Sequence, residues 1–212
     1  MLGGRESGKT NIINAYLENK FSFETLPTTE CDTFYKKFNF DNWEYLFKIF
    51  DTAGQERYRK ISNSTIQIAD GIVMVFAIDN HNSYKEIVYW IKFIDELINL
   101  EEKVLFIIGN KIDVKPEERK VTKNQVEEFT KRINVKYFET SAYSRQGINV
   151  AFKEIFKEVY EKNKLDNNNK PNYQYKKKIN YSSICTNEIK KLNNIIYNTL
   201  SKLFPLNKYN SY

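Results

Sequence analysis

Two nearly unbroken apolar runs constrain the fold of this chain most strongly. Residues 71–78 ("GIVMVFAI") and 103–109 ("KVLFIIG") are almost free of polar side chains, which is typical of strands buried on both faces of a parallel sheet. Amphipathic stretches lie between the apolar runs, and Ser83 with Glu86 and Thr122 with Gln125 each fit the capping box that opens a helix. Strands that alternate with helices predict an α/β fold, a doubly wound and mostly parallel sheet flanked by helices.

An antiparallel hairpin is expected at one edge of this sheet. Residues 33–40 ("TFYKKFNF") and 43–50 ("WEYLFKIF") read as strands, and Asp41-Asn42 between them is a turn signal. A shorter strand is expected at 135–139, and a closing amphipathic helix at 149–162. The folded domain is therefore predicted to cover residues 1–162.

The segment after residue 162 has a different composition. Residues 163–183 are rich in Asn and Lys and predict a linker, and residues 184–212 carry apolar side chains at helical spacing that predict an amphipathic helix. Nine lysines face only two acids from residue 163 onward, so the net charge of +6 resides in this tail. The tail either contacts acidic lipid headgroups or is simply a solvated segment. Its lysines alternate with asparagines and do not form one dense cluster, which favours the second interpretation.

Several classes of protein are disfavoured by composition. The chain of 212 residues has two cysteines far apart, no secretory signal, and no apolar run near the roughly 20 residues that cross a bilayer. The aromatic residues show no nucleic-acid signature. A cytoplasmic location is expected.

The first chemical motif is the string "GGRESGKT" near the N-terminus, which matches the phosphate loop G-x-x-x-x-G-K-[ST]. Its glycines let the backbone turn so that amide hydrogens point at phosphate oxygens. Lys9 would reach the β- and γ-phosphates, and the Thr10 hydroxyl would ligate magnesium. Because a single pattern of this kind also arises by chance, further motifs are needed. The predicted phosphate-binding residues are Gly3, Gly4, Arg5, Glu6, Ser7, Gly8, Lys9 and Thr10.

The second motif is "IFDTAGQERY", in which an apolar strand ends at Asp51. The carboxyl ends of parallel strands are where α/β proteins bind ligands. Asp51 can hold magnesium through a water, Gly54 can offer its amide to a γ-phosphate, and Gln55 can orient an attacking water as the catalytic residue.

Two further motifs follow later strands and predict a guanine site. Asp113, in "NKID", can accept hydrogen bonds from the ring N–H and the amino group of guanine, whereas adenine would leave this charge unpaired. Asn110 would tie the loop together, and the stem of Lys111 would cover the base. In "ETSA", Ser141 would brace the loop and the Ala142 amide could bond the guanine carbonyl. The four motifs occur in this order along the chain. We therefore expect a P-loop NTPase that binds GTP with Mg²⁺.

From residue 3 to about 162, the chain resembles the Ras superfamily of small GTPases. The strings "DTAGQERYRKI" and "NHNSYKEIVYWI" are most similar to its Rab branch. The resemblance implies that Thr28 binds magnesium, that Phe21 flanks the guanine, and that Tyr143 stands at a guanine-site position usually held by lysine. It also implies a GTP/GDP switch with an exchange factor, an activating protein and effectors on its switch regions. Such proteins direct vesicle traffic from the cytosolic face of an organelle membrane.

Three departures from the family pattern carry expectations. Arg5 and Glu6 replace small residues in the phosphate loop, so slow hydrolysis and a weak response to activating proteins are expected. No cysteine lies near the C-terminus to carry a prenyl anchor. Only Met1 and Leu2 precede Gly3, so most of the first strand is missing, a loss on the order of 10 kcal/mol. The hypothesis is a truncated start.

Two function classes stay open. An active GTPase switch is favoured by the presence of the full set of expected residues, which are Lys9, Thr10, Thr28, Asp51, Gln55 and Asp113. The phosphate-loop substitutions and the missing strand favour the alternative, a non-cycling scaffold or truncated product with impaired nucleotide binding.

Overall fold

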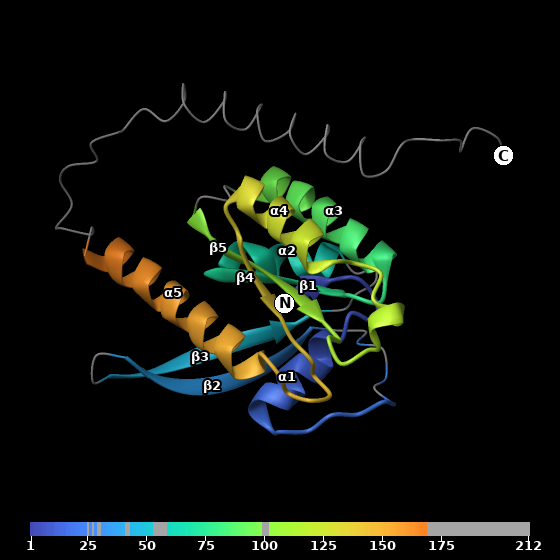
Figure 1. Cartoon of the computed structure of the whole chain (residues 1–212). Helices are drawn as coiled ribbons and strands as arrows, with labels where there is room; N and C mark the ends of the chain where they lie inside the picture. The colour runs from blue at the N-terminus through green and yellow to red at the C-terminus, as the bar shows by residue number, and fades with distance from the viewer. Residues whose placement is uncertain are drawn as a thin grey trace. The chain divides into compact units, whose positions relative to one another are not determined.

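The computed structural model describes residues 1–24, 26, 28, 31–40, 43–52, 59–98 and 102–168. Four strands form a parallel sheet in the order β1-β4-β5-β6, and two more form an antiparallel pair (Figure 1). The strands are β1 (Leu2–Gly3), β2 (Asp32–Phe40), β3 (Trp43–Asp51), β4 (Gly71–Ala77), β5 (Val104–Asn110) and β6 (Lys136–Glu139). The helices are α1 (Lys9–Leu17), α2 (Arg59–Ile68), α3 (His81–Leu97), the short 3-10 helix η3 (Pro116–Glu118), α4 (Lys123–Ile133) and α5 (Ile148–Asn168).

The central strands are buried on both faces, as their apolar sequences predict. In β4, Val73 and Val75 belong to a core shared with α1 and α5. Phe76 is also fully buried, and its ring lies 5.1 Å from that of Tyr84 on α3. Because successive side chains of a strand point to opposite faces, helices must cover both sides of this sheet. The predicted α/β fold with a mostly parallel sheet is confirmed.

The antiparallel pair differs from the prediction in one respect, because it forms a sheet of its own rather than an edge of the parallel one. The strand that would join the two sheets is β1, which has two residues. Met1 makes the connection instead: its amino group donates to the carbonyl of Phe50, and its carbonyl accepts from Thr52 Oγ1 at 2.7 Å. For the two sheets to be joined, β1 would need more residues paired with β3.

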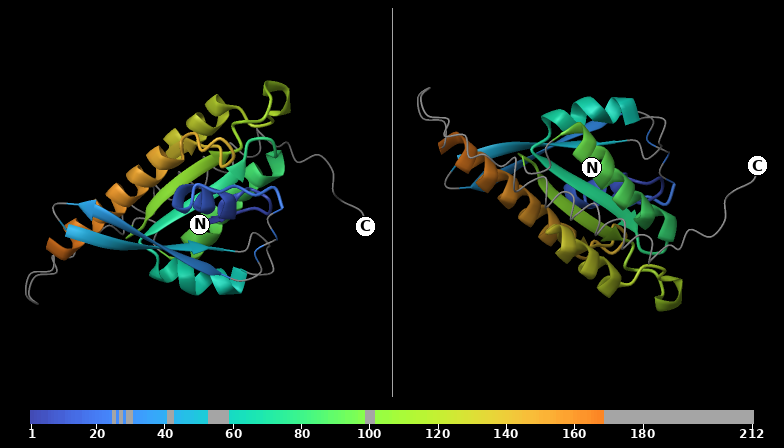
Figure 2. Two further views of the ribbon diagram at one scale, coloured as in Figure 1. Left: turned by 90° about the horizontal axis from the view of Figure 1, so that it is seen from below. Right: turned by 90° about the horizontal axis from the view of Figure 1, so that it is seen from above.

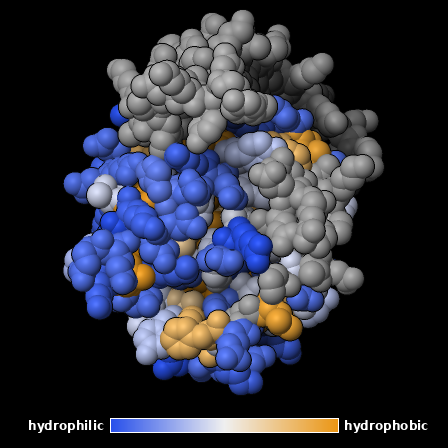
Figure 3. All heavy atoms as spheres, turned by 90° about the vertical axis from the view of Figure 1, so that its right-hand side faces the viewer, coloured by the Kyte–Doolittle hydropathy of each residue, from blue (hydrophilic) through white to orange (hydrophobic). Residues whose placement is uncertain are grey.

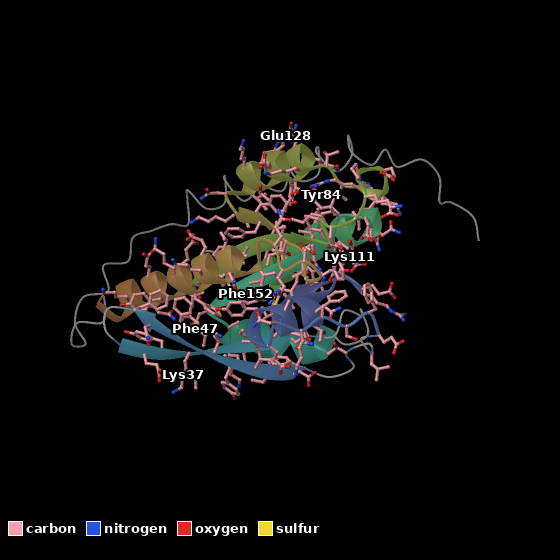
Figure 4. The ribbon with its side chains drawn as sticks, turned by 60° about the horizontal axis from the view of Figure 1, so that its bottom comes forward. Lys37, Phe47, Tyr84, Lys111, Glu128 and Phe152 are labelled. Atoms are coloured by element: carbon pink, nitrogen blue, oxygen red, sulfur yellow. The ribbon has the colours of Figure 1, made fainter. Side chains whose placement is uncertain are left out.

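Helix α5 covers the β2–β3 pair with aromatic contacts. The ring of Phe156 lies 4.3 Å from that of Phe47, and the ring of Tyr160 lies 4.6 Å from that of Phe40. In both views of Figure 2, the C-terminal part of α5 lies beside the hairpin end of the β2–β3 pair, and the helix diverges from the strands beyond it. In Figure 4, Phe47 and Phe152 lie between the same two elements. This packing holds the pair in place without a ladder to the parallel sheet.

An apolar cleft of about 920 Å³ lies beyond Met1, between β3 and β4. It is found at the amino end of β4, where Gly71 and Ile72 line it. Ile49 of β3 and Ile155 of α5 form other parts of its wall. Of the predicted nucleotide-binding residues that the structure describes, none lines this cleft.

Two sequence expectations about helix ends need correction. The box of Ser83 and Glu86 does not cap α3, because Asn80 is the N-cap and its side chain accepts from the amides of Asn82 and Ser83. Ser83 Oγ instead donates to the carbonyl of Ala77 at 3.2 Å. The expected cap at Thr122 is confirmed, since its hydroxyl accepts from the Gln125 amide.

The second correction concerns α5, which extends six residues past the expected boundary at residue 162. No glycine or proline interrupts the chain before Pro171, so no residue type stops the helix at residue 162. Residues Met1–Asn169 belong to one compact unit. The rest of the predicted linker and the predicted tail helix lie outside the described residues. Among the residues that are described, every helix is too short or too polar to cross a bilayer.

Candidate nucleotide site

The phosphate loop joins β1 to α1 and is held in shape by its own backbone. The hydroxyl and the amide of Ser7 both donate to the carbonyl of Gly4, at 2.9 and 3.4 Å. Gly8 has a φ of 87°, and a Cβ there would lie 2.4 Å from Asn110 Nδ2. Only glycine therefore fits this position without displacing the asparagine. Gly8 is also the N-cap of α1, so the positive end of that helix faces the loop.

Lys9 is buried beneath the loop with its ammonium group on backbone oxygens. Its Nζ donates to the carbonyls of Gly3 and Gly4, both at 3.0 Å. Burial lowers its pKa to about 8, while the negative charges of Asp51 and Glu86 act in the opposite direction. A desolvated ammonium satisfied by neutral carbonyls would gain from a nearby anion. The arrangement suits a phosphate oxygen.

The three predicted magnesium ligands meet at the end of β3. Thr10 Oγ1 donates to Asp51 Oδ2 at 2.6 Å and lies 3.1 Å from Thr28 Oγ1. Asp51 is fully buried, and its Oδ1 has no hydrogen-bond partner within the described part of the chain. Burial raises the pKa of this carboxyl, whereas the hydrogen bond from Thr10 acts to lower it. An unsatisfied buried carboxylate oxygen beside two hydroxyls fits the oxygen ligands that Mg²⁺ prefers.

Arg5 and Glu6 form an exposed ion pair within the phosphate loop. Arg5 Nε lies 3.3 Å from Glu6 Oε1, and the two side chains are 60% and 75% exposed. Glu6 has a φ of 60°, a left-handed conformation that a residue with a Cβ adopts at a cost. Both side chains line the same cavity as Lys9 and Thr10. The loop thus combines strain with a negative charge on the phosphate side.

Asn110, at the end of β5, links the phosphate loop to the base end of the site. Its Nδ2 donates to the carbonyl of Ser7 at 3.1 Å, and its Oδ1 accepts from Thr140 Oγ1 at 3.3 Å. The Ala142 amide, which the sequence assigns to the guanine carbonyl, donates to the same Oδ1 at 3.2 Å. The Asn110 side chain therefore holds three segments together from a fully buried position.

Asp113 and Lys111 form the base end of the cavity. Ser141 Oγ donates to Asp113 Oδ1 at 2.5 Å, which fixes one carboxylate oxygen. Lys111 has a φ of 70°, and its Nζ lies 3.3 Å from Asp79 Oδ2. Figure 4 shows Lys111 beyond the end of the parallel strands, on the side of the phosphate loop. The stem of Lys111 is thus held across the site by a carboxylate.

One cavity of about 550 Å³ unites the phosphate end and the base end. The predicted residues that line it are Arg5, Glu6, Gly8, Lys9, Thr10, Phe21, Thr28, Asn110, Lys111, Asp113, Ala142 and Tyr143. Gly3, Gly4, Ser7, Asp51 and Ser141 lie behind this lining and bond to it. Figure 3 shows the side of the molecule that lies on the right of Figure 1; the residues coloured there are mostly hydrophilic, with a few apolar patches between them.

Two predicted residues lie outside the described part of the chain, and several contributors to the site were not predicted. Gly54 and the catalytic candidate Gln55 lie outside the described residues. Sequence motifs gave no sign of Phe23, which lines the cavity, or of Asp79, which holds Lys111. Glu86 was assigned only to a helix cap, whereas its carboxylate lies close behind Gly4. Phe23 and Asp79 belong to no motif, so only the fold could reveal their place in the site.

Comparison with known proteins supports the same assignment. The family model described as "Ras family" matches residues 1–161. The chain is 30% identical to human Ras-related protein Rab-21 over 172 residues, which is 81% of this chain and 76% of the relative. It is 30% identical to Ras-related protein Rab-13 of Bos taurus (81% and 85% covered) and 32% identical to Ras-related protein Rab-11B of Dictyostelium discoideum (81% and 80%). The chain belongs to the Ras family and is a small GTPase similar to the Rab proteins.

Proposed function

We propose that this chain is a Rab-like molecular switch that binds GTP and GDP with Mg²⁺, hydrolyses GTP slowly and regulates vesicle traffic. The observation that carries the proposal is the single cavity in which Lys9 and Thr10 lie at one end and Asp113 at the other. A phosphate-binding end and a purine-selective end joined in one cavity suit a nucleoside phosphate.

At the phosphate end, Lys9 would exchange the carbonyls of Gly3 and Gly4 for phosphate oxygens, gaining charge-assisted bonds. Thr10, Thr28 and Asp51 would hold Mg²⁺, which neutralises charge on the β- and γ-phosphates when it is bound. Thr28 belongs to a loop outside the helices and strands, so its contact with Thr10 is the link by which that loop would sense the nucleotide.

At the base end, Asp113 would accept hydrogen bonds from the ring N–H and amino group of guanine. Ser141 already fixes one of its oxygens, which reduces the freedom lost on binding. Phe21 and the stem of Lys111 would flank the purine. Adenine would leave the carboxylate without donors in a desolvated pocket, a loss that strongly disfavours it.

Hydrolysis would use Gln55 to orient water, with Gly54 donating to the γ-phosphate. The exposed guanidinium of Arg5 stands on the phosphate side of the cavity, where it would crowd the water or an activating residue from a partner. Slow hydrolysis and a poor response to activating proteins follow. Exchange factors and effectors would bind the switch segments, and the basic tail would give a weak contact with acidic membranes at most.

A second function, a non-cycling scaffold, is favoured by Arg5 and by the strained, acidic Glu6 in the phosphate loop. Single-turnover hydrolysis of GTP separates the two. The switch predicts measurable hydrolysis that Gln55→Leu abolishes and Arg5→Gly accelerates. GTP bound without turnover in every variant would support the scaffold, and absence of nucleotide binding by the parent chain would contradict the proposal.

A further inference from the structure

Three aromatic side chains cluster at the mouth of the base end of the cavity. The ring of Phe21 lies 4.8 Å from that of Phe23 and 5.3 Å from that of Tyr143, with interplanar angles of 86° and 76°. The rings of Phe23 and Tyr143 lie 5.6 Å apart. All three pairs are thus within the range of favourable ring contacts, and both pairs involving Phe21 are edge-to-face.

This cluster is built from two segments that are far apart in the sequence. Phe21 and Phe23 follow α1, whereas Tyr143 follows β6 in the loop that also contains Ser141. All three side chains line the same cavity as Lys111 and Asp113. The contact therefore closes a bridge of rings across the mouth of the base end.

The exposure of the cluster indicates that it does not exist to stabilise the core. Phe23 is 84% exposed and Tyr143 is 58% exposed. Neither side chain belongs to the buried apolar core, so their packing contributes little to folding. Exposed apolar groups gathered around a polar pocket are a common feature of ligand sites, because the ligand supplies the missing contact.

We propose that Phe23 and Tyr143 are positioning residues that hold the Phe21 ring upright and close an aromatic clamp over a bound purine nucleotide, slowing its release. The inference rests on the proposed function and deepens it, since it assigns retention of the base to a three-ring cluster. Two edge-to-face partners that also contact each other restrict the plane of Phe21 before the ligand arrives, so less freedom is lost on binding. Tyr143 thereby helps to cover the base with an aromatic ring, at a position where a lysine would cover it with its stem.

The test compares release of a fluorescent GDP analogue from the parent chain and from Phe23→Ala, Tyr143→Ala and the double variant. Each single substitution should raise the dissociation rate about fivefold, equivalent to about 1 kcal/mol. The double variant should release the analogue more slowly than the product of the two effects predicts, because the rings share one cluster. Tyr143→Phe keeps the ring and should restore slow release.

Tyr35→Ala is the matched control, because Tyr35 on β2 is 57% exposed and does not line the cavity. The affinity for inorganic pyrophosphate, which has no base, separates a clamp on the purine from a general disturbance of the site. It should stay constant while GDP release quickens. If the parent chain binds GDP but releases it at the same rate as all the variants, or if pyrophosphate and GDP weaken together, the clamp is refuted. If the parent chain binds neither GDP nor GTP, the proposed function itself fails.

Discussion

Replacing Glu6 by glycine should both stabilise the protein and tighten its hold on GTP. Glu6 stands in the phosphate loop at a φ of 60°. A left-handed conformation costs a residue with a Cβ about 1–2 kcal/mol, whereas glycine adopts it freely. Against this gain stands the greater flexibility of glycine in the unfolded chain, about 0.5–1 kcal/mol. The exposed ion pair with Arg5 is lost as well, but pairs of this kind contribute little.

The net effect of Glu6→Gly is therefore an increase of about 0.5–1 kcal/mol in the free energy of unfolding, or a few degrees in the melting temperature of a chain this size. Glu6→Ala keeps the Cβ and loses the charge, so it isolates the backbone term. Urea denaturation of both variants in the nucleotide-free state should place Glu6→Gly above Glu6→Ala. If the two variants are equally stable, the strain assigned to this φ does not exist.

The charge of Glu6 is tested separately with Glu6→Gln, which retains the backbone strain. Its carboxylate lines the cavity on the phosphate side but is 75% exposed, so solvent screens much of its repulsion. Removing the charge should tighten GTP binding only a few-fold, as measured by titration calorimetry at low salt. Affinity that falls in Glu6→Gln would show that the carboxylate helps to bind the nucleotide.

Three further predictions concern the site and the cleft. Asn110→Ala should lower the free energy of unfolding in urea by about 3 kcal/mol, because it leaves buried partners such as the Thr140 hydroxyl and the Ser7 carbonyl unsatisfied; an unchanged value would contradict the linking role. Lys9 has a pKa of about 8 in the free protein, and its ammonium group is the form that binds phosphate. The affinity for GDP should therefore be constant below pH 8 and fall by up to tenfold per pH unit above it. Lys9→Met should abolish this pH dependence in calorimetric titrations. An extension of five residues with alternating apolar side chains before Met1 should enter the cleft between β3 and β4 and raise the melting temperature, whereas a Gly-Ser extension of equal length should not; equal melting temperatures would show that the cleft accepts no strand.

The sequence predicted the parallel strands and the nucleotide loops because each has a local signature. The apolar run of residues 71–78 has the length and composition typical of a buried strand, and Gly8 and Lys9 fall in a pattern with a fixed backbone geometry. Thr122 capped α4 as predicted, since a cap depends on residues three positions apart. Features set by neighbours in sequence were thus predictable.

Features set by tertiary contacts were not predictable from the sequence. Ser83 looks like a helix cap, but its hydroxyl is drawn to the carbonyl of Ala77, and Asn80 takes the capping role. The separation of the β2–β3 pair from the parallel sheet depends on how few residues of β1 are paired. Phe23 lines the base end of the cavity because the fold brings the segment after α1 next to Tyr143.

The most direct test of the central claim is the preference for guanine over adenine at Asp113. Titration calorimetry of the parent chain with Mg²⁺ should show binding of GTP and none of ATP at the same concentrations, because only guanine offers two donors to the carboxylate. Asp113→Asn should lose GTP and gain affinity for xanthosine triphosphate, whose base presents a carbonyl in place of the amino group. Equal binding of ATP and GTP by the parent chain, or unchanged GTP affinity in Asp113→Asn, would contradict the account.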